Sequence, residues 1–379
     1  MNVSEQADPA GRGSAQDVRW RRPDVARGAV TAPDGVLLVD KPQGLTSHDV
    51  VGATRRLAAT RKVGHAGTLD PMATGLLVLG IGRATRFLTY LVGADKTYEA
   101  TIRLGVETTT EDAEGEVTTA HGCRRDDLTE ERLRKALAVL TGQIQQVPSA
   151  VSAIKVDGVR AYKRIRDGQD VELEARPVTI HKLRLTGRPR RARADVISSA
   201  APGAAEGATA DGAGGETEVV DLDVAVACSS GTYVRALARD LGRALGCGAH
   251  LTALRRTGVG PFGVDEVQTL AALSEQTQAD ADSPHPRGLA TIPLEEVARR
   301  CFEQLTLTET EARGLRFGQP LDISVLERAQ APAGHWGPLA STGTSGRRVI
   351  AGFAPEGRLV ALLTPQGSRA RPVLVLDPA

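Results

Sequence analysis

The sequence predicts a mixed α+β fold, because strand-like and helix-like segments follow one another without a regular β-α-β alternation. The segment GVLLVDKPQG, from residue 35, is an apolar run closed by a Pro/Gly turn and is typical of a strand. KTYEATIRLGVET, from Lys96, alternates apolar and polar residues and indicates a strand with one buried face. LTEERLRKALAVLTG has helical spacing, with Thr129 as its cap and Gly142 as its stop.

Four further segments extend this pattern along the chain. TSHDVVGATRRLAA predicts a helix capped by Thr46 or Ser47. GLLVLGIG predicts a buried strand, and RATRFLTYLVGA, which follows it, has helical spacing. TEVVDLDVAVACSSGTYVRALARDLGRALG, from Thr217, predicts a strand, a turn and a helix.

The chain of 379 residues is long enough for two domains. Residues 1–34 are polar and predict a disordered tail. The main domain is expected over residues 35–273, with a mobile, Ala- and Gly-rich insertion at 188–217. Residues 274–290 predict a linker, and the short apolar runs of residues 291–379 predict a small β-rich domain.

Composition bounds the class of protein. Apolar residues make up 41% of the chain, enough for a sizeable core, and the net charge of +1 neither favours nor excludes a polyanionic partner. None of the four cysteines forms a C-x-x-C pair, which argues against a disulfide framework or a structural zinc site. Without a secretory signal or a run of about 18 apolar residues, the chain is predicted to be cytoplasmic and to have no membrane contact.

One carboxylate, Asp70, lies among small and apolar residues in GHAGTLDPMATGLL. An Asp before a proline is most often a turn former. Asp70 belongs to no D-x-D or D-[ST]-G pattern, the chain has no H-x-x-x-H, and GIGRAT is an incomplete glycine loop, so phosphoenzymes, aspartic proteases, zincins and nucleotide cofactors have no support. The remaining functional interpretation is a carboxylate that acts alone as a nucleophile or a base.

Such a carboxylate needs a nearby cation, and CSSGTYVRALARDLGRALGCGAH offers Arg235. Tyr233 and Arg235 are two residues apart, so on an extended segment their side chains would point the same way. The alternative is that Arg235 is a solvated residue at the start of a helix. Basic residues are also dense between Cys228 and Thr257, with five Arg and one Asp, and in VRAYKRIR and RPRRAR. They suit an RNA backbone, or they form ordinary solvated helix faces.

Five stretches together resemble the TruB-type bacterial tRNA pseudouridine-55 synthases, over roughly residues 35–262. They are GVLLVDKPQGLTSHDVV, KVGHAGTLDPMATGLLVLGIGRATR, DKTYEATIRLGVETTTEDAEG, QVPSAVSAIKVDGVRAYKRIRDGQDVELEARPVTI and CSSGTYVRALARDLGRALGCGAHLTALRRTGVGPF. The resemblance implies a central, largely antiparallel sheet flanked by helices, with an RNA cleft across it. It also implies isomerisation of uridine-55 in the T-arm loop of tRNA to pseudouridine, with base flipping and with no metal or cofactor.

The resemblance also assigns roles to residues. It makes Asp70 the catalytic aspartate, Arg235 its partner, and Tyr98 the tyrosine that stacks on the target base and helps to remove the C5 proton. The alternative for Tyr98 is a core aromatic of a strand.

Four further residues take roles near the substrate. Tyr233 and Leu254 would line the pocket, and His65 would stabilise the flipped nucleotide. Lys41 would brace the active-site loops, with contact to a phosphate as the alternative.

The C-terminal part matches less closely, although LRFGQPLDI resembles the start of a PUA-type RNA-binding module. A PUA-like domain would hold the acceptor end of the tRNA through its phosphates. We expect a monomer whose partner is tRNA, with no obligate protein partner. The alternative is a tRNA-binding or tRNA-folding module without catalysis. A metal- or nucleotide-dependent hydrolase is a remote third interpretation, because ligand clusters and a phosphate loop are missing from the sequence.

Overall fold

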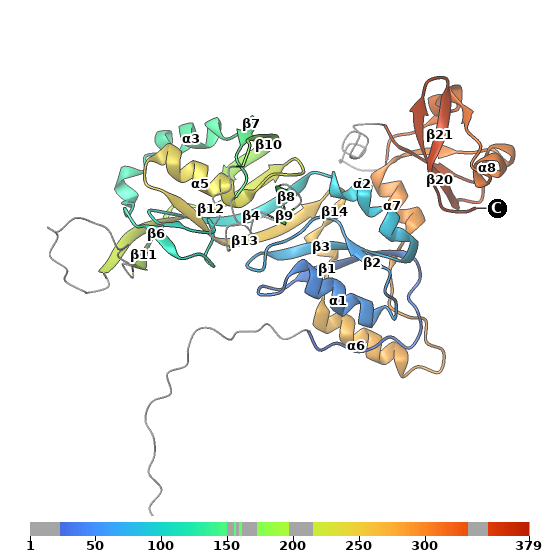
Figure 1. The fold of residues 1–379 in the computed structure, drawn as a ribbon, viewed down its shortest axis with the longest axis horizontal. Helices are drawn as coiled ribbons and strands as arrows, with labels where there is room; N and C mark the ends of the chain where they lie inside the picture. Colours follow the sequence, from blue (N-terminus) through green and yellow to red (C-terminus); the bar gives the residue numbers. More distant parts are fainter. Residues whose placement is uncertain are drawn as a thin grey trace, which may run out of the picture.

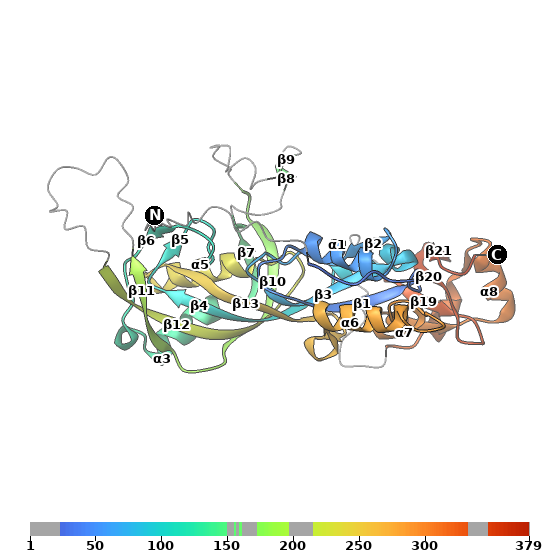
Figure 2. The same ribbon diagram turned by 90° about the horizontal axis from the view of Figure 1, so that it is seen from below.

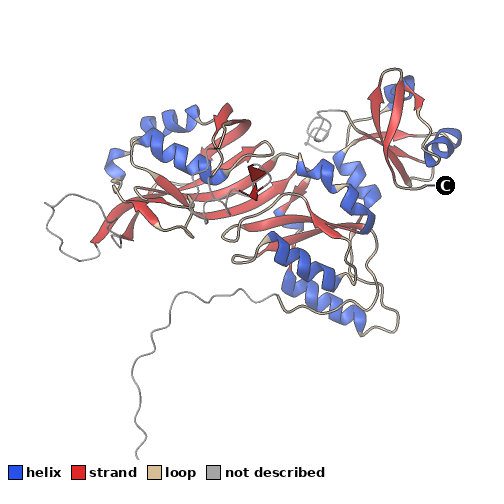
Figure 3. Ribbon diagram, viewed as in Figure 1, coloured by secondary structure: helices blue, strands red, loops and turns tan. Residues whose placement is uncertain are grey.

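A computed structural model describes residues 23–149, 155–156, 159–160, 173–196, 215–332 and 348–378. Its strands form one long sheet and a smaller C-terminal sheet, and helices pack on their faces (Figures 1 and 3). Within the described residues the long sheet has 12 strands, and its main path runs β15-β1-β3-β13-β4-β12-β10-β7. Most neighbours are antiparallel; β1 with β15 and β3 with β13 are parallel. The predicted α+β class with a largely antiparallel central sheet is confirmed.

One half of the long sheet is built around the first two predicted strands. Strand β1 pairs with β3 along its whole length, from Gly35 opposite Ile81 to Lys41 opposite Gly75. Their side chains alternate between two apolar clusters, so both faces of this half are covered. Helices α1 and α6 cover one face, and α2 and α7 cover the other. The elements are β1 (Gly35–Lys41), α1 (Ser47–Leu57), β2 (Val63–His65), β3 (Thr74–Ile81), the 3-10 turn Gly82–Arg86, α2 (Leu88–Val92), β14 (Phe262–Gly263), the 3-10 turn Val264–Glu266, β15 (Gln268–Thr269), α6 (Leu270–Ala281), β16 (Ile292–Pro293) and α7 (Leu294–Cys301).

The other half places helices α3 and α5 on one face of β4, β12 and β13 (Figure 1). The predicted alternation of β4 is confirmed, because Tyr98, Ala100, Ile102 and Leu104 are all buried in this cluster. The predicted helix caps are confirmed at Thr129, and at Thr46 for α1. The elements are β4 (Lys96–Leu104), β5 (Glu107–Thr108), β6 (Val117–Thr119), the 3-10 turn Arg125–Asp127, α3 (Glu130–Val139), β7 (Gly142–Gln146), β8 (Lys155–Val156), β9 (Val159–Arg160), β10 (Arg176–Leu185), β11 (Arg190–Val196), β12 (Gly215–Cys228), α5 (Val234–Leu245) and β13 (Ala249–Val259).

The two halves join where β3 runs beside β13, with Gly75 opposite Arg256. Gly75 has a φ of +97°, and a Cβ atom there would lie 2.3 Å from the carbonyl oxygen of Arg256. Only glycine allows this close approach of the two backbones. The junction places the loop that follows β2 beside the start of α5.

The C-terminal module has its own five-stranded sheet, in the order β17-β19-β20-β21-β18 (Figure 2). Its inner core is separate, but α7 and one side of the module also pack against the long sheet through Phe87, Phe302 and Phe353. The predicted β-rich C-terminal domain is confirmed, and it is attached through an apolar cluster. Its elements are β17 (Glu303–Thr306), α8 (Glu309–Arg316), β18 (Leu321–Asp322), the 3-10 turn Ile323–Arg328, β19 (Ile350–Phe353), β20 (Leu359–Gln366) and β21 (Arg369–Val375).

Three predicted boundaries differ from the structure. Residues 23–34 of the expected tail are ordered: Val25 is buried, and Gly28 donates a backbone hydrogen bond to Arg56. Residues 274–281 of the expected linker belong to α6, whose leucines pack on the long sheet. Both ends of the expected insertion at 188–217 are strand, because β11 pairs with β12 from Arg190 to Val196.

These three differences share a cause. In each segment, contacts with residues distant in sequence hold small or polar residues in an ordered structure. The rest of the tail and of the insertion lies outside the described residues, as does most of VRAYKRIR.

Candidate active site

The predicted catalytic residues meet in a pocket of about 460 Å³ at the junction of the two halves. The loop after β2, strands β4 and β13 and the start of α5 form its walls. All but one of the predicted site residues line it. They are His65, Asp70, Tyr98, Tyr233, Arg235 and Leu254.

Asp70 lies in a tight turn, in which the amide of Ala73 donates to the Asp70 carbonyl at 3.1 Å. The turn-forming interpretation is confirmed, and the functional role of Asp70 stays a prediction. On one side, Ser47 at the start of α1 exchanges two hydrogen bonds with the backbone of Leu69. On the other side, the Pro71 carbonyl accepts from the amide of Gly44 at 2.8 Å. The backbone on both sides of Asp70 is thus anchored before any substrate arrives.

Lys41 does not line this pocket. It is fully buried, and its Nζ donates to the carbonyls of Pro42 at 2.9 Å, Leu45 at 2.6 Å and Pro71 at 3.2 Å. Burial lowers the pKa of Lys41 to about 8, although the charge of Asp70 acts in the opposite direction. These hydrogen bonds match the predicted bracing role. They use all three N–H donors of the ammonium group, so none is left for a phosphate.

Arg256 is a second internal brace, and sequence reasoning missed its role. Its side chain is 1% exposed and donates to the backbone carbonyls of Leu76, Thr68 and Gly67. Two of these acceptors belong to the loop that leads to Asp70. The sequence interpretation had counted Arg256 among cations that would face RNA.

Asp70 and Arg235 form the predicted ion pair, with 3.0 Å between Arg235 Nε and Asp70 Oδ2. The guanidinium is 5% exposed, whereas the carboxylate is 37% exposed and so faces the pocket. The sequence analysis assumes an extended segment here, but the structure shows the start of a helix. Tyr233 is the cap residue of α5 and Arg235 lies in its first turn, so the helix start sets the direction of the guanidinium.

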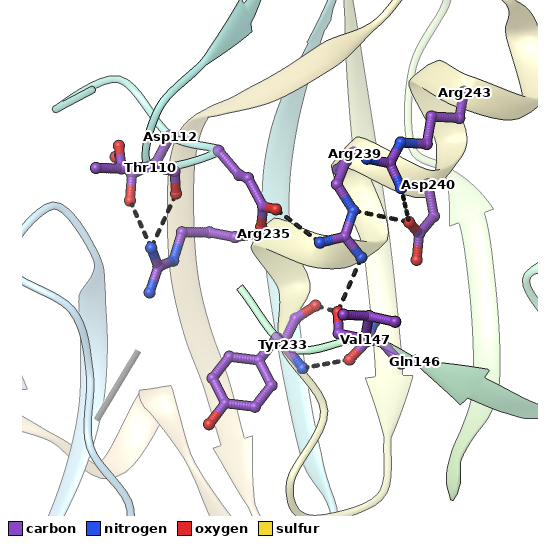
Figure 4. Close-up of polar contacts among 10 residues, drawn as sticks. Thr110, Asp112, Gln146, Val147, Tyr233, Arg235, Arg239, Asp240 and Arg243 are labelled. Carbon is purple, nitrogen blue, oxygen red and sulfur yellow. Dashed lines mark hydrogen bonds and ion pairs between the residues drawn. The ribbon is translucent and has the colours of Figure 1, made fainter. Parts of the chain in front are cut away.

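A second carboxylate, Asp112, flanks Arg235 and was not predicted (Figure 4). Its Oδ2 lies 3.4 Å from Arg235 Nη1, which also donates to the carbonyl of Thr110 at 2.9 Å. Asp112 is itself buried, and its Oδ1 accepts from the Thr110 hydroxyl and the Glu114 amide. The guanidinium is therefore fixed on the side away from Asp70. The TTTEDAEG segment carried this residue, but only the fold shows that it meets α5.

Tyr98 reaches the pocket from β4 and is 8% exposed. Burial raises the pKa of its phenol, while the positive charge of Arg256 lowers it, and the net direction is upward. The hydroxyl therefore stays protonated around neutral pH. Tyr98 belongs to the apolar cluster and also lines the pocket, so its place in the core does not exclude the predicted role, which stays a prediction.

Tyr233 is held by a buried glutamine that the sequence analysis did not single out. Gln146 accepts from the Tyr233 amide at 2.9 Å and donates to its carbonyl at 3.1 Å (Figure 4). Leu254, on β13, adds an apolar side to the pocket. Lys96 also lines the pocket, and burial lowers its pKa to about 8.

His65 lies at the edge of the pocket, with its ring edge-on to His48 at 5.7 Å between ring centroids. Burial lowers the pKa of His65, the Gly67 backbone opposes this shift, and His48 adds to it. His65 is therefore neutral at pH 7 and offers a ring face and edge rather than a charge. In the described part of the chain, no three His, Cys, Asp or Glu side chains come together in a way that would hold a metal ion.

Four of the five arginines between Cys228 and Thr257 have partners that tie them into the fold, whereas Arg243 stays largely exposed beside Asp240. Besides Arg235 and Arg256, Arg239 pairs with Glu111 at 2.7 Å and Arg255 pairs with Asp40 at 2.8 Å. This stretch supports the active site from within. Neither the RNA interpretation nor the solvated-face alternative describes it.

Comparisons with known proteins show the family to which the chain belongs. Residues 55–201 match the model of the TruB family pseudouridylate synthase N-terminal domain, and residues 235–297 match the tRNA pseudouridylate synthase B C-terminal domain. A tRNA pseudouridine synthase B from Arthrobacter sp. (strain FB24) is 52% identical over 91% of this chain and 97% of that protein. One from Thermobifida fusca (strain YX) is 45% identical over 90% of this chain and 98% of that protein.

Solved structures share the fold. A chain from a Cbf5-Nop10-Gar1 complex has a TM-score of 0.61 at 23% identity, covering 91% of this chain and 85% of that chain. A chain from an H/ACA RNP bound to a substrate RNA containing 2'-deoxyuridine has a TM-score of 0.58 at 22% identity, with 91% and 85% covered. The family models and the curated relatives define the chain as a pseudouridine synthase, which is an isomerase. The chain belongs to the TruB family, the tRNA pseudouridine synthases B. Among the described residues, no helix has the length and apolarity to cross a membrane.

Proposed function

We propose that the protein converts uridine-55 in the T-arm loop of tRNA to pseudouridine, without a metal or cofactor, and that Asp70 starts the reaction. The observation that carries this proposal is the buried Arg235, which leaves its partner Asp70 partly exposed in a pocket of about 460 Å³. A loop base can enter such a pocket only after it has been flipped out of its stack. In this pocket it meets an ionic carboxylate, a phenol and apolar side chains.

The proposed reaction keeps every atom of the nucleotide except one proton that is exchanged. The N1–C1′ bond breaks, the uracil rotates, a C5–C1′ bond forms, and the proton on C5 leaves while N1 gains one. Asp70 acts as the nucleophile or the base, and the guanidinium of Arg235 keeps its negative charge compensated. Tyr98 supplies a ring face to the base and a phenol near the C5 proton.

Two features of the pocket favour chemistry over simple RNA binding. Arg235 is fixed by Asp112 on one side and faces Asp70 on the other, so the reactive carboxylate is positioned before the substrate binds. His65 is placed at the pocket edge, where a flipped nucleotide would enter.

The test is release of tritium from a tRNA transcript labelled at C5 of uridine, with no added metal or nucleotide. The wild-type protein should release tritium, and a transcript with cytidine at position 55 should abolish that release. Asp70→Asn should bind tRNA within a few fold of wild type and form no product. Substantial turnover by Asp70→Asn would refute the role of Asp70. Tight tRNA binding by wild type without tritium release would instead support the tRNA-folding alternative.

We further propose that the C-terminal module contacts the acceptor end of the tRNA and that the protein acts as a monomer. Arg369 and Arg371 support the first proposal, because both are exposed on the same face of β21. The exposed large apolar side chains of the described residues support the second, because they come from separate elements and build no broad apolar face. Light scattering of the free protein, and footprinting of the acceptor end with Arg369→Gln/Arg371→Gln, test these two points.

A further inference from the structure

A wide hollow lies apart from the catalytic pocket, along the exposed side of α1. It has a volume of about 1130 Å³ and is bounded by α1, the turn before β2 and the segment that precedes β1. We call it the α1 groove, and it is defined by Arg27, His48, Asp49, Arg55, Arg56 and Arg61.

The charge of the α1 groove is positive and uncompensated. Four arginines face two aspartates, Asp24 and Asp49, which leaves a net charge of +2. Among the described residues, none of these arginines has a carboxylate within ion-pair distance. Asp49 is engaged instead with the backbone amide and hydroxyl of Thr46. The five arginines between Cys228 and Thr257 differ, because each is paired with a carboxylate or buried against carbonyls.

Two of the groove arginines are held in place by neutral groups. Arg56 donates to the carbonyl of Val25, and Arg55 donates to the carbonyl of Val63 at 3.4 Å. The backbone of residues 28–32 is tied to the end of α1 by amide hydrogen bonds to Arg56 and Ala58. The cations are therefore oriented without being neutralised, which is the arrangement that an external anion requires. The negative end of the α1 dipole offsets only part of their charge.

The α1 groove also leads to the catalytic pocket. His48 lines the groove, and its ring contacts that of His65, which lines the pocket. Figure 2 shows α1, which carries His48, beside β2, the strand that ends at His65. Helix α1 has 11 residues, so it is about 16 Å long, enough for several successive phosphates of an RNA strand.

We propose that the α1 groove binds the phosphodiester backbone of the RNA strand whose flipped nucleotide enters the pocket past His48 and His65. This inference rests on the proposed function. The proposed ligand of the α1 groove is the sugar-phosphate backbone. The groove therefore contributes affinity and sets the position of the RNA strand, while base identity is read elsewhere.

The test compares tRNA binding by the full chain, as a function of salt, for two variants that lose equal charge. Arg27→Gln/Arg61→Gln removes two exposed groove cations that donate no hydrogen bond to the described residues. Arg134→Gln/Lys135→Gln is the control on α3, where both side chains are exposed and pair with Glu131.

The groove variant should weaken tRNA binding roughly tenfold or more at 0.1 M salt. Its slope of log K against log salt should fall by about 1.4–1.8, since each lost phosphate contact lowers the slope by about 0.7–0.9. Single-turnover tritium release at saturating tRNA should remain at the wild-type rate. Arg27→Lys/Arg61→Lys should restore most of the affinity, and this also shows that a loss is not caused by misfolding.

The proposal is overturned if the groove and control variants lose the same affinity, if the groove slope does not change, or if the lysine variant fails to recover. These outcomes differ from a failure of the proposed function. In that case wild type would release no tritium, while the salt slope would still report whether the α1 groove holds RNA.

Discussion

Replacing Lys41 with methionine tests the idea that a buried cation holds the loop of Asp70. Methionine keeps most of the volume of the stem but removes three hydrogen bonds to carbonyls, one of them to Pro71. A hydrogen bond from a charged donor contributes about 1.5–3 kcal/mol, so three contribute on the order of 5–9 kcal/mol. Burial lowers the pKa of Lys41 from 10.5 to about 8, which corresponds to a cost of roughly 3 kcal/mol. The variant should therefore be less stable by roughly 2–6 kcal/mol.

The same substitution makes a prediction for pH. Below pH 8, Lys41 is protonated in both the folded and the unfolded chain. Between pH 8 and 10.5 the folded protein loses this proton first, so the unfolded chain binds more protons and the free energy of unfolding rises with pH. Lys41→Met should lack this part of the rise. Lys96 has the same lowered pKa but donates to the carbonyls of Val92 and Ala94, so Lys96→Met should lose a similar part while the hydrogen bonds that hold the loop of Asp70 remain.

Urea unfolding from pH 7 to 10.5 measures both effects, and single-turnover tritium release measures the loop. We expect Lys41→Met to lower the rate of the chemical step at saturating tRNA while binding tRNA nearly as well as wild type, because Asp70 moves but the RNA surface does not. A variant as stable and as fast as wild type, with an unchanged rise in stability above pH 8, would refute this account of Lys41.

Two further predictions follow from backbone geometry. Gly75→Ala should destabilise the protein by at least about 2 kcal/mol, because its Cβ would lie 2.3 Å from the Arg256 carbonyl and its φ of +97° is unfavourable for alanine. A melting temperature equal to that of wild type would contradict this. The control is Gly52→Ala, because a Cβ at Gly52 has open space. Replacing residues 197–214 with a two-residue Asn-Gly turn should leave tritium release within about twofold of wild type. Val196 and Gly215 are direct partners at the end of the β11–β12 ladder, so a hairpin turn can join them. A large loss of rate would place part of that segment in the site.

The sequence predicted those elements whose cause is local. Thr46 and Thr129 cap their helices because each is followed within three residues by the amide that it accepts from. The alternation of β4 predicted its buried face because side chains of a strand alternate. The resemblance predicted the meeting of Asp70 and Arg235, which no local pattern could show.

The errors concern partners that lie far apart in the chain. Arg255 was taken for an RNA-facing cation, yet it pairs with Asp40, 215 residues away. Residues 274–281 looked like part of a linker because their composition is polar, but α6 needs only a few leucines to pack on the long sheet. Asp112 carried no signal of its own, because a carboxylate in a turn-rich segment usually faces water.

The distribution of arginines separates two uses of the same side chain. Arginines on α5 and β13 have carboxylate or carbonyl partners inside the protein, and each such partner helps to fix Asp70 or the strands around it. The four arginines of the α1 groove have no carboxylate partner among the described residues. Their mutual repulsion destabilises the folded protein, as it does in any cluster of like charge. A net charge of +1 for the whole chain hides this division. We therefore infer an RNA-binding surface from the cations that have no carboxylate partner among the described residues, because most of the arginines between Cys228 and Thr257 have internal partners instead.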